Sequence, residues 1–353
     1  MQVAPESDEV LLEGCGAIQK GGHCGGSKVS CRANVVPLRK GGQAAGRCMD
    51  EQRPLDARLT EQRNPRSTRI DQYPLLDIVD LINAEDRMVA DAVHEERLAI
   101  ARAIELVIGA FERGGRLFYV GAGTSGRLGV LDASEMPPTY GTDPDRIQGI
   151  IAGGAPALVS AQEGAEDHPE DGAHEIDTRD VGPDDFVLGI ATSGTTPFVH
   201  GALERARERG ARTGFLLCTY PSRALAEAYD VVIAPLVGPE VISGSTRMKA
   251  GTATKMVLNT ITTAAMVRMG KVYGNLMVDL QVTAEKLHDR GIRILMETLH
   301  VVRPAAAELL EASGGHVKTA IVMGRLGLDR DGARSALERE HGVLGRVVGD
   351  LDA

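Results

Sequence analysis

The sequence predicts an α/β protein: a three-layer sandwich with a parallel sheet, followed by a small C-terminal helical module. Two observations carry this prediction. Between residues 116 and 236, short apolar segments alternate with segments of helical spacing, which is typical of a parallel sheet covered by helices on both faces. After residue 246 the strand-like segments stop, and long stretches with few glycines or prolines follow.

Five strands are expected within the sandwich. Before them, residues 78–113 have apolar side chains at helical spacing and few breakers, which predicts a helical segment. Another helix should run from Phe198 to Arg209, with Pro197 in its first turn. Ligands of parallel sheets bind at the carboxyl ends of the strands, so the loops there are the first candidates for a site. We place the strands at residues 116–120, 147–152, 185–191, 213–218 and 231–236.

The C-terminal part is expected to be helical. Residues 246–269 and 279–312 are mostly free of breakers, and each is predicted as one long helix. Residues 316–350 should form two or three short helices separated by Gly327 and Gly342. This region therefore predicts the small helical module that completes the chain.

The chain is accordingly divided into a flexible N-terminal extension (1–55), a parallel-sheet domain (56–297) and a C-terminal helical module (298–353). Four of the five cysteines lie in the first 48 residues, and this stretch has more basic than acidic residues although the whole chain has a formal net charge of −10. These cysteines lack the Cys-x2-Cys pairs of common zinc sites, so no metal is expected. Met49 is a candidate for the true first residue, because a different composition begins there.

Composition also excludes several kinds of partner. The acidic balance and the low aromatic content, 3% with no Trp, argue against binding of nucleic acid. No stretch of 18 apolar residues occurs, so no transmembrane helix and no membrane partner are expected. The sequence has no secretory signal and a single cysteine after residue 48, so we expect a cytoplasmic protein.

A glycine-rich loop follows the first predicted strand. Its sequence, Gly121-Ala-Gly-Thr-Ser-Gly126, matches the dinucleotide-binding pattern Gly-x-Gly-x-x-Gly. That pattern needs an acidic residue at the tip of the second strand, and here the second strand ends in Ile151-Ala-Gly-Gly154. A nicotinamide cofactor is therefore not favoured, and we expect no cofactor.

A second loop after the third strand repeats the same chemistry. The first loop carries Thr124 and Ser125, and the second carries Ser193, Gly194 and Thr195. Backbone N–H groups and hydroxyls at two helix N-termini predict binding of one phosphate monoester. The alternative is that both loops are ordinary turns whose hydroxyls cap helices.

Two groups of carboxylates flank these strand ends. Pro137 and Pro138 should end the helix after the first loop, which would place its acidic residues at an exposed turn. Two carboxyls with separated pKa values can divide acid and base work on a bound ligand, whereas solvated surface charge is the alternative. The carboxylates concerned are Asp132, Glu135, Glu163, Glu166 and Asp167.

Four strings together resemble the N-acetylmuramic acid 6-phosphate etherase family, and the last is shared with the related glucokinase regulatory protein. The resemblance extends over residues 52–350. It implies a sugar isomerase (SIS) domain that binds phosphosugars, usually as a homodimer, with a helical module behind it. The strings are Thr60-Glu-Gln-Arg-Asn-Pro-Arg-Ser67, Gly121 to Glu135, Glu163-Gly-Ala-Glu-Asp167 and Gly238 to Ala253.

The resemblance implies a carbon–oxygen lyase that cleaves the lactyl ether of N-acetylmuramic acid 6-phosphate by elimination and then water addition. The products are N-acetylglucosamine 6-phosphate and D-lactate, in a cell that recycles peptidoglycan and catabolises amino sugars. Glu135 is implied as the general acid for the departing lactate, and Glu166 as the base on the C2 proton. A non-catalytic phosphosugar sensor on the same fold is the alternative.

The resemblance also implies ligands for the sugar phosphate. Ser125, Ser193 and Thr195 resemble phosphate ligands, with Thr124 and Gly194 beside them in the loops. Glu163, Ser245 and Thr246 resemble substrate contacts of the regulatory protein. Arg63 and Asn64 either order an arm across a partner subunit or only cap the first helix. Since the sequence shows no basic cluster, we expect backbone amides and hydroxyls to bind the phosphate.

Overall fold

The computed structural model describes residues 58–280 and 285–351. The predicted extension 1–55 and the candidate start at Met49 lie outside these residues. The residues that are described all belong to one compact unit. None of the described helices combines the length and the hydrophobicity that a membrane-spanning helix needs.

The predicted parallel sheet is confirmed. Its order is β2-β1-β3-β4-β5, and every neighbouring pair is parallel. Gly121 at the end of β1 is level with Ile151 of β2 and with Ile190 of β3, so three carboxyl ends meet at one edge. The strands lie within three residues of their predicted ends: β1 Leu117–Gly121, β2 Ile147–Ile151, β3 Phe186–Ile190, β4 Arg212–Leu216 and β5 Val231–Ile233.

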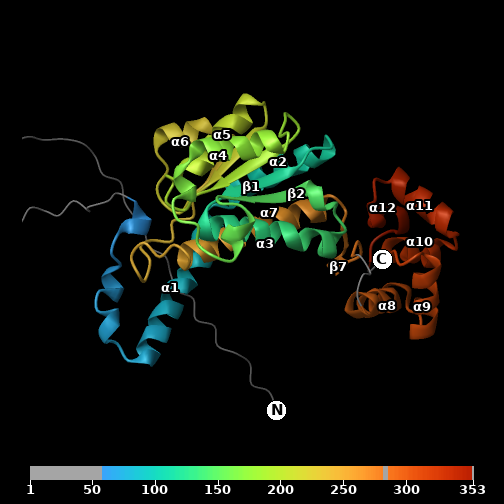
Figure 1. Cartoon of the computed structure of the whole chain (residues 1–353). Helices are drawn as coiled ribbons and strands as arrows, with labels where there is room; N and C mark the ends of the chain where they lie inside the picture. Colours follow the sequence, from blue (N-terminus) through green and yellow to red (C-terminus); the bar gives the residue numbers. More distant parts are fainter. Residues whose placement is uncertain (1–57, 281–284, 352–353) are drawn as a thin grey trace, which may run out of the picture. The chain divides into compact units, whose positions relative to one another are not determined.

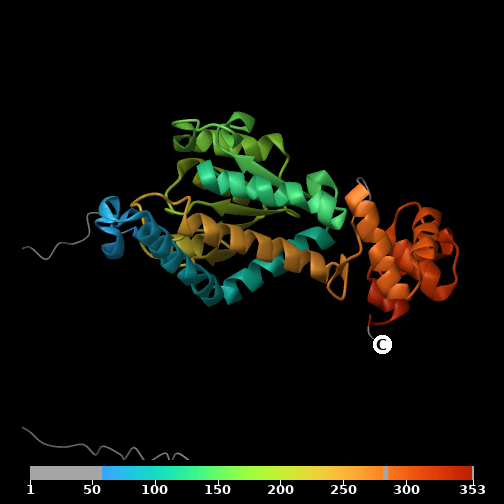
Figure 2. The same ribbon diagram turned by 90° about the horizontal axis from the view of Figure 1, so that it is seen from below.

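Helices cover both faces of this sheet (Figures 1 and 2). The first cluster of buried side chains lies between the sheet and α1, α2, α3 and α7, and the second joins the other face to α4 and α5, with α6 packed at its margin. The predicted three-layer sandwich is therefore confirmed. The helices are α1 Leu75–Glu95, α2 Arg97–Glu112, α3 Gly123–Tyr140, α4 Pro169–Thr178, α5 Pro197–Glu208, α6 Arg223–Ala228 and α7 Lys249–Arg268.

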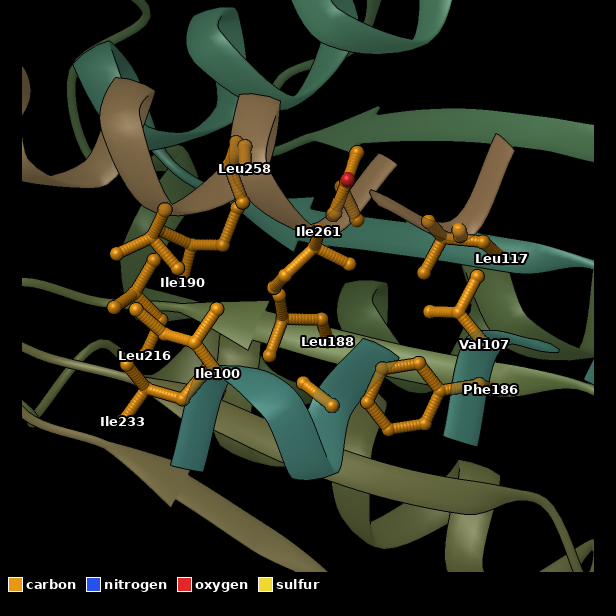
Figure 3. Packing of buried hydrophobic residues seen from close by; sticks show 14 of the residues in the cluster. Ile100, Val107, Leu117, Phe186, Leu188, Ile190, Leu216, Ile233, Leu258 and Ile261 are labelled. Carbon is orange, nitrogen blue, oxygen red and sulfur yellow. The ribbon is translucent and has the colours of Figure 1, made fainter. Parts of the chain in front are cut away.

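The strands are apolar throughout because both faces are buried. In β1 the side chains of Leu117 and Tyr119 enter the first cluster, and those of Phe118 and Val120 enter the second. Figure 3 shows the first cluster from close by, with strand residues packed against α2 and α7.

The predicted helix over residues 78–113 is two helices, α1 and α2. The break lies at Glu96, whose carboxylate accepts a hydrogen bond from the Ala234 N–H at 3.1 Å. Apolar spacing continues across the break, so periodicity alone could not reveal it.

The C-terminal helices have their own cluster of buried side chains. The predicted long helix over 279–312 is wrong: His300 has a left-handed φ of 54°, and Pro304 lies in the first turn of a new helix. Three short helices follow, as expected. The boundary expected at 297/298 falls inside α8 and stays a prediction. The elements are the hairpin β6 Val272–Tyr273 and β7 Leu276–Met277, then α8 Glu285–Leu299, α9 Arg303–Ala312, α10 Val317–Leu326, α11 Arg330–Arg339 and α12 Leu344–Val348.

A buried ion pair between α1 and α7 is the point at which the N-terminal arm, residues 58–74, binds the sandwich. Lys249 at the start of α7 and Glu85 of α1 are each 1% exposed, and Nζ lies 2.6 Å from Oε2. Asn64 of the arm donates to the same oxygen at 2.9 Å, and Arg66 donates to Oε1 at 2.8 Å. Burial alone would raise the pKa of Glu85, but its bond with Lys249, with Asn64 and Arg66, holds that pKa below its usual value.

The segment 238–248 lies between the arm and α7. Buried Glu240 accepts hydrogen bonds from the N–H groups of Lys249 and Ala250, so it caps α7. From the arm, the Ser67 hydroxyl donates to the carbonyl oxygen of Val241 at 2.7 Å. The arm and the first turn of α7 therefore position this segment from two sides.

We expect the Glu85–Lys249 pair to be essential for stability. Glu85→Gln should lower the free energy of unfolding by about 3–5 kcal/mol at pH 7, because it leaves the buried Lys249 without its counter-ion. Lys249→Met should lower it less, because Glu85 keeps its ion pair with Arg66. Urea unfolding measures this loss. Glu105→Gln is the control, since its exposed pair with Arg102 on α2 should contribute less than about 1 kcal/mol.

The same pair predicts a pH dependence. Because the pKa of Glu85 is lowered in the folded state, its stabilisation is complete above its unfolded pKa, about 4.5, and is lost as the pH falls through the folded pKa. The stability difference between the wild type and Glu85→Gln should therefore shrink below pH 4.5. A difference that stays constant down to acid unfolding would contradict the charge-based explanation.

Candidate active site at the carboxyl ends of the strands

A cavity of about 470 Å³ opens at the carboxyl ends of β1 and β3. Five separate parts of the chain form its walls: the arm, the first turn of α3, the turn after β2, the loop after β3 and the loop after β5. Polar side chains predominate among its lining residues, which suits a hydrophilic ligand. The functional groups in its walls are Arg58, Glu61, Thr124, Ser125, Glu166, Asp167, Thr192, Ser193, Thr195, Thr196 and Thr246.

The first predicted loop is the junction of β1 and α3. Strand β1 ends at Gly121 and α3 begins at Gly123, so Thr124 and Ser125 lie in the first helical turn. A Cβ on Gly121 would lie 2.7 Å from the backbone nitrogen of Gly126, which shows how closely the helix crosses the strand end. The N–H groups and the positive dipole end of α3 therefore point toward the cavity edge.

The second predicted loop lies between β3 and α5. Its turn depends on Gly194, which has a φ of 79°, and the hydroxyls of Ser193 and Thr195 lie 3.1 Å apart. His200, in the first turns of α5, contacts the Gly194 carbonyl oxygen through Nε2 at 2.9 Å. Helix α5 starts at Pro197, as expected. Two helix N-termini and their hydroxyls thus line one cavity, an arrangement that suits a phosphate.

Glu166 lies in a short helical turn, Ala165–Asp167, after β2. Its side chain is exposed and lines the cavity. Glu163 does not share its face, because Gly164 between them has a φ of 77° and breaks any helical register. Glu163 is exposed and is not among the residues that line the cavity.

Glu135 lies farther along α3 than the cavity-lining residues Thr124 and Ser125. The prediction that two prolines end its helix is wrong: α3 includes Pro137 and Pro138 and ends at Gly141, whose left-handed φ of 62° allows its N–H to reach the Pro137 carbonyl oxygen. Glu135 is an exposed residue ten positions after Ser125, about 15 Å along the helix axis. It is not among the residues that line the cavity.

Asp132, the other candidate on α3, joins the core layers. It is 4% exposed and accepts hydrogen bonds from Tyr119 of β1 at 3.0 Å and from Asn259 of α7 at 2.7 Å. Burial raises its pKa, although these donors oppose the shift. Its bonds tie β1 and α7 to α3 and leave it away from the cavity.

The segment after β5 contributes one predicted residue directly. Thr246 lines the cavity with Gly244, whereas Ser245 between them is half-buried outside the lining. Gly244 has a φ of 75°, and a Cβ there would lie 3.4 Å from Oε2 of Glu61. The Glu61 carboxylate therefore lies directly against this segment.

Sequence reasoning missed the contribution of Arg58 and Glu61. Glu61 belongs to the first of the four motif strings, in which a role is predicted for Arg63 and Asn64 only. Asn64 caps the short helical turn Pro65–Ser67 and binds Glu85, while Arg63 is exposed. No local pattern distinguishes Arg58 from other surface arginines.

The chain is similar to known proteins over most of its described length. A family model described as the glucokinase regulatory protein N-terminal SIS domain matches residues 99–207. The N-acetylmuramic acid 6-phosphate etherase of Salinibacter ruber is 56% identical over 81% of this chain and 92% of its own length. The etherase of Synechococcus elongatus is 55% identical over 82% of this chain and 94% of its own length. That of Crocosphaera subtropica is 52% identical over 81% of this chain and 93% of its own length. A phosphoheptose isomerase from Neisseria gonorrhoeae superposes with a TM-score of 0.42 at 16% identity, over 54% of this chain and 99% of its own.

The close crossing of α3 over β1 predicts that Gly121 is irreplaceable. Gly121→Ala should cost about 1–3 kcal/mol in unfolding free energy, because the new methyl group would push against the backbone of residues 125 and 126. Inorganic phosphate should also raise the melting temperature of this variant less than that of the wild type. Gly182→Ala is the control, since no atom lies within 4 Å of the added Cβ.

Proposed function

Because the chain belongs to the N-acetylmuramic acid 6-phosphate etherase family, we propose that the cavity between the two hydroxyl-rich loops is its active site. The protein is a carbon–oxygen lyase that cleaves the lactyl ether of N-acetylmuramic acid 6-phosphate, with N-acetylglucosamine 6-phosphate and D-lactate as products. The observation that carries the site proposal is the meeting of Thr124, Ser125, Ser193 and Thr195 with the Glu166 carboxylate in one cavity.

Glu166 acts as the base in this proposal. The open-chain sugar has an aldehyde at C1, which makes the C2 proton acidic. Glu166 takes this proton, the C2–H electrons form a double bond to C3, and the bond from C3 to the lactyl oxygen breaks. Water then adds its hydroxyl to C3 while a proton returns to C2. The accessible carboxylate in the cavity wall supports this role.

Glu135 is proposed as the general acid that protonates the departing lactate. It lies about 15 Å along α3 from Ser125 and is not among the residues that line the cavity with Glu166. A homodimer in which α3 of the second copy reaches the cavity would complete the pair. The need for an acid, and the exposed position of Glu135, support this arrangement.

Exposed apolar side chains support a dimer that uses α1, α2, α3 and α7, the helices on one face of the sheet. A groove on α7 includes Ala264 and Val267, and Leu131 lies one turn before Glu135 on α3. Burial of such a face against a second copy would remove apolar surface from water. The exposed apolar residues of these helices are Leu75, Leu76, Val79, Met88, Leu98, Leu131 and Val267.

A cytoplasmic location is part of the same proposal. The substrate carries a phosphate and a carboxylate, and such an anion does not diffuse through the apolar interior of a bilayer. The enzyme must then lie in the compartment where the sugar is phosphorylated.

Release of D-lactate from N-acetylmuramic acid 6-phosphate tests the function. We expect Glu166→Gln to abolish lactate release and the exchange of the C2 proton with solvent. Glu135→Gln should lose release, by at least about 10²-fold, but retain exchange, because the base remains. Equal loss of exchange in both variants would contradict the division of roles. A folded protein that binds the sugar phosphate without releasing lactate would support the regulator instead.

Mixing the two inactive variants tests the contribution of the second copy. If each site combines Glu166 of one subunit with Glu135 of the other, hybrid dimers have one intact site and one doubly altered site. An equal mixture, after subunit exchange, should recover roughly a quarter of the wild-type rate. Light scattering should show a dimer. No recovery from a mixture proven to contain hybrids would place both carboxyls on one subunit.

A further inference from the structure

Cationic side chains are scarce in the described part of the cavity wall. The substrate is an anion, yet Glu61, Glu166 and Asp167 all lie in the walls. The two loops provide hydroxyls and backbone N–H groups, which are neutral donors. Among the described residues that line the cavity, Arg58 alone has a cationic side chain. We propose that Arg58 binds the phosphate of the substrate, as an extension of the active-site assignment above.

The position of the guanidinium group supports this role. Arg58 is half-buried, and its Nη1 donates to the hydroxyl oxygen of Thr195 at 3.3 Å. Thr195 and Ser193 belong to the loop that is expected to bind the phosphate. A guanidinium has five N–H donors in a planar fork that matches two phosphate oxygens, so it can bind Thr195 and a phosphate together.

The backbone around Arg58 is held at several points. The next N–H, of Leu59, donates to the buried Thr219 hydroxyl after β4 at 3.0 Å. The carbonyl oxygen of Thr60, a fully buried residue, accepts from the Gly244 N–H at 3.0 Å. The carbonyl oxygen of Glu61 accepts from the Ser243 hydroxyl at 3.1 Å. Arg58 therefore projects from a fixed turn and not from a loose chain end.

The arm is anchored a second time behind this turn. Asn64 donates to Glu85 at 2.9 Å and to the carbonyl oxygen of Pro239 at 3.1 Å. A cation that is positioned before the ligand arrives loses less conformational entropy on binding. The same turn places the Glu61 carboxylate against Gly244. The guanidinium of Arg58 therefore contacts the loop after β3, and the carboxylate of Glu61 contacts the segment after β5.

A purely structural role, in which Arg58 only ties the arm to Thr195, is the competing explanation. Equilibrium binding separates the two. Arg58→Ala should weaken binding of N-acetylglucosamine 6-phosphate and of inorganic phosphate by a similar factor, about 10–100-fold by calorimetry. Arg58→Lys should retain part of the affinity, because the charge remains while the bidentate fork is lost.

The control is Arg69→Ala, which removes an exposed arginine of the same arm that is bonded to Gln72. It should leave both affinities and the rate unchanged. In lactate release, Arg58→Ala should raise KM by the same factor as the loss of affinity and change kcat by less than about threefold. Unchanged affinity for phosphate in a folded Arg58→Ala variant, or a loss confined to kcat and melting temperature, would overturn the proposal. The binding measurement needs no turnover, so it tests the role of Arg58 even if the protein releases no lactate.

Discussion

The salt bridge between Glu85 and Lys249 determines how the whole site is assembled. Two charges that are each 1% exposed are tolerated only when every oxygen and ammonium group has a partner. Asn64 and Arg66 supply the remaining donors to Glu85, so the arm is required for the pair to be stable. Lys249 begins α7 while its N–H binds Glu240, so the segment before α7 is fixed too. One buried interaction thereby sets the positions of the arm, α1, α7 and the segment that carries Thr246.

The remaining walls depend on close backbone packing. Gly121 lets α3 begin directly over the end of β1, and Gly194 turns the chain between β3 and α5. Both loops then present hydroxyls and helix N-termini at one sheet edge, where parallel strands end together. Rigid neutral donors suit the recognition of a phosphate, while the charged groups enter from the arm and from the turn after β2. The site thus combines a precise local scaffold with charges supplied by distant segments.

The sheet and the two loops could be predicted because their signals are local. Strands buried on both faces are continuous apolar segments, and the hydroxyl-rich loops follow them directly in the chain. Long-range packing explains the failures. The break at Glu96 coincides with a hydrogen bond to Ala234, and the continuation of α3 through Pro137 and Pro138 ends only at Gly141. Arg58 and Glu61 face the cavity because Thr219 and Gly244 bind the arm next to them, and no pattern near residue 60 contains that information.

The double anchoring of the arm has a consequence for the order of folding during synthesis. Arg58 and Glu61 leave the ribosome early. Thr219, which binds the neighbouring Leu59, follows 160 residues after it, and Lys249 follows 164 residues after its partner Glu85. Until Lys249 emerges, the Glu85 carboxylate has no buried counter-ion and must stay in water. Closing loops of this length slows folding, because chain entropy is lost before the contacts form. The sandwich strands can therefore pair first, and the cavity is completed only when α7 has been made.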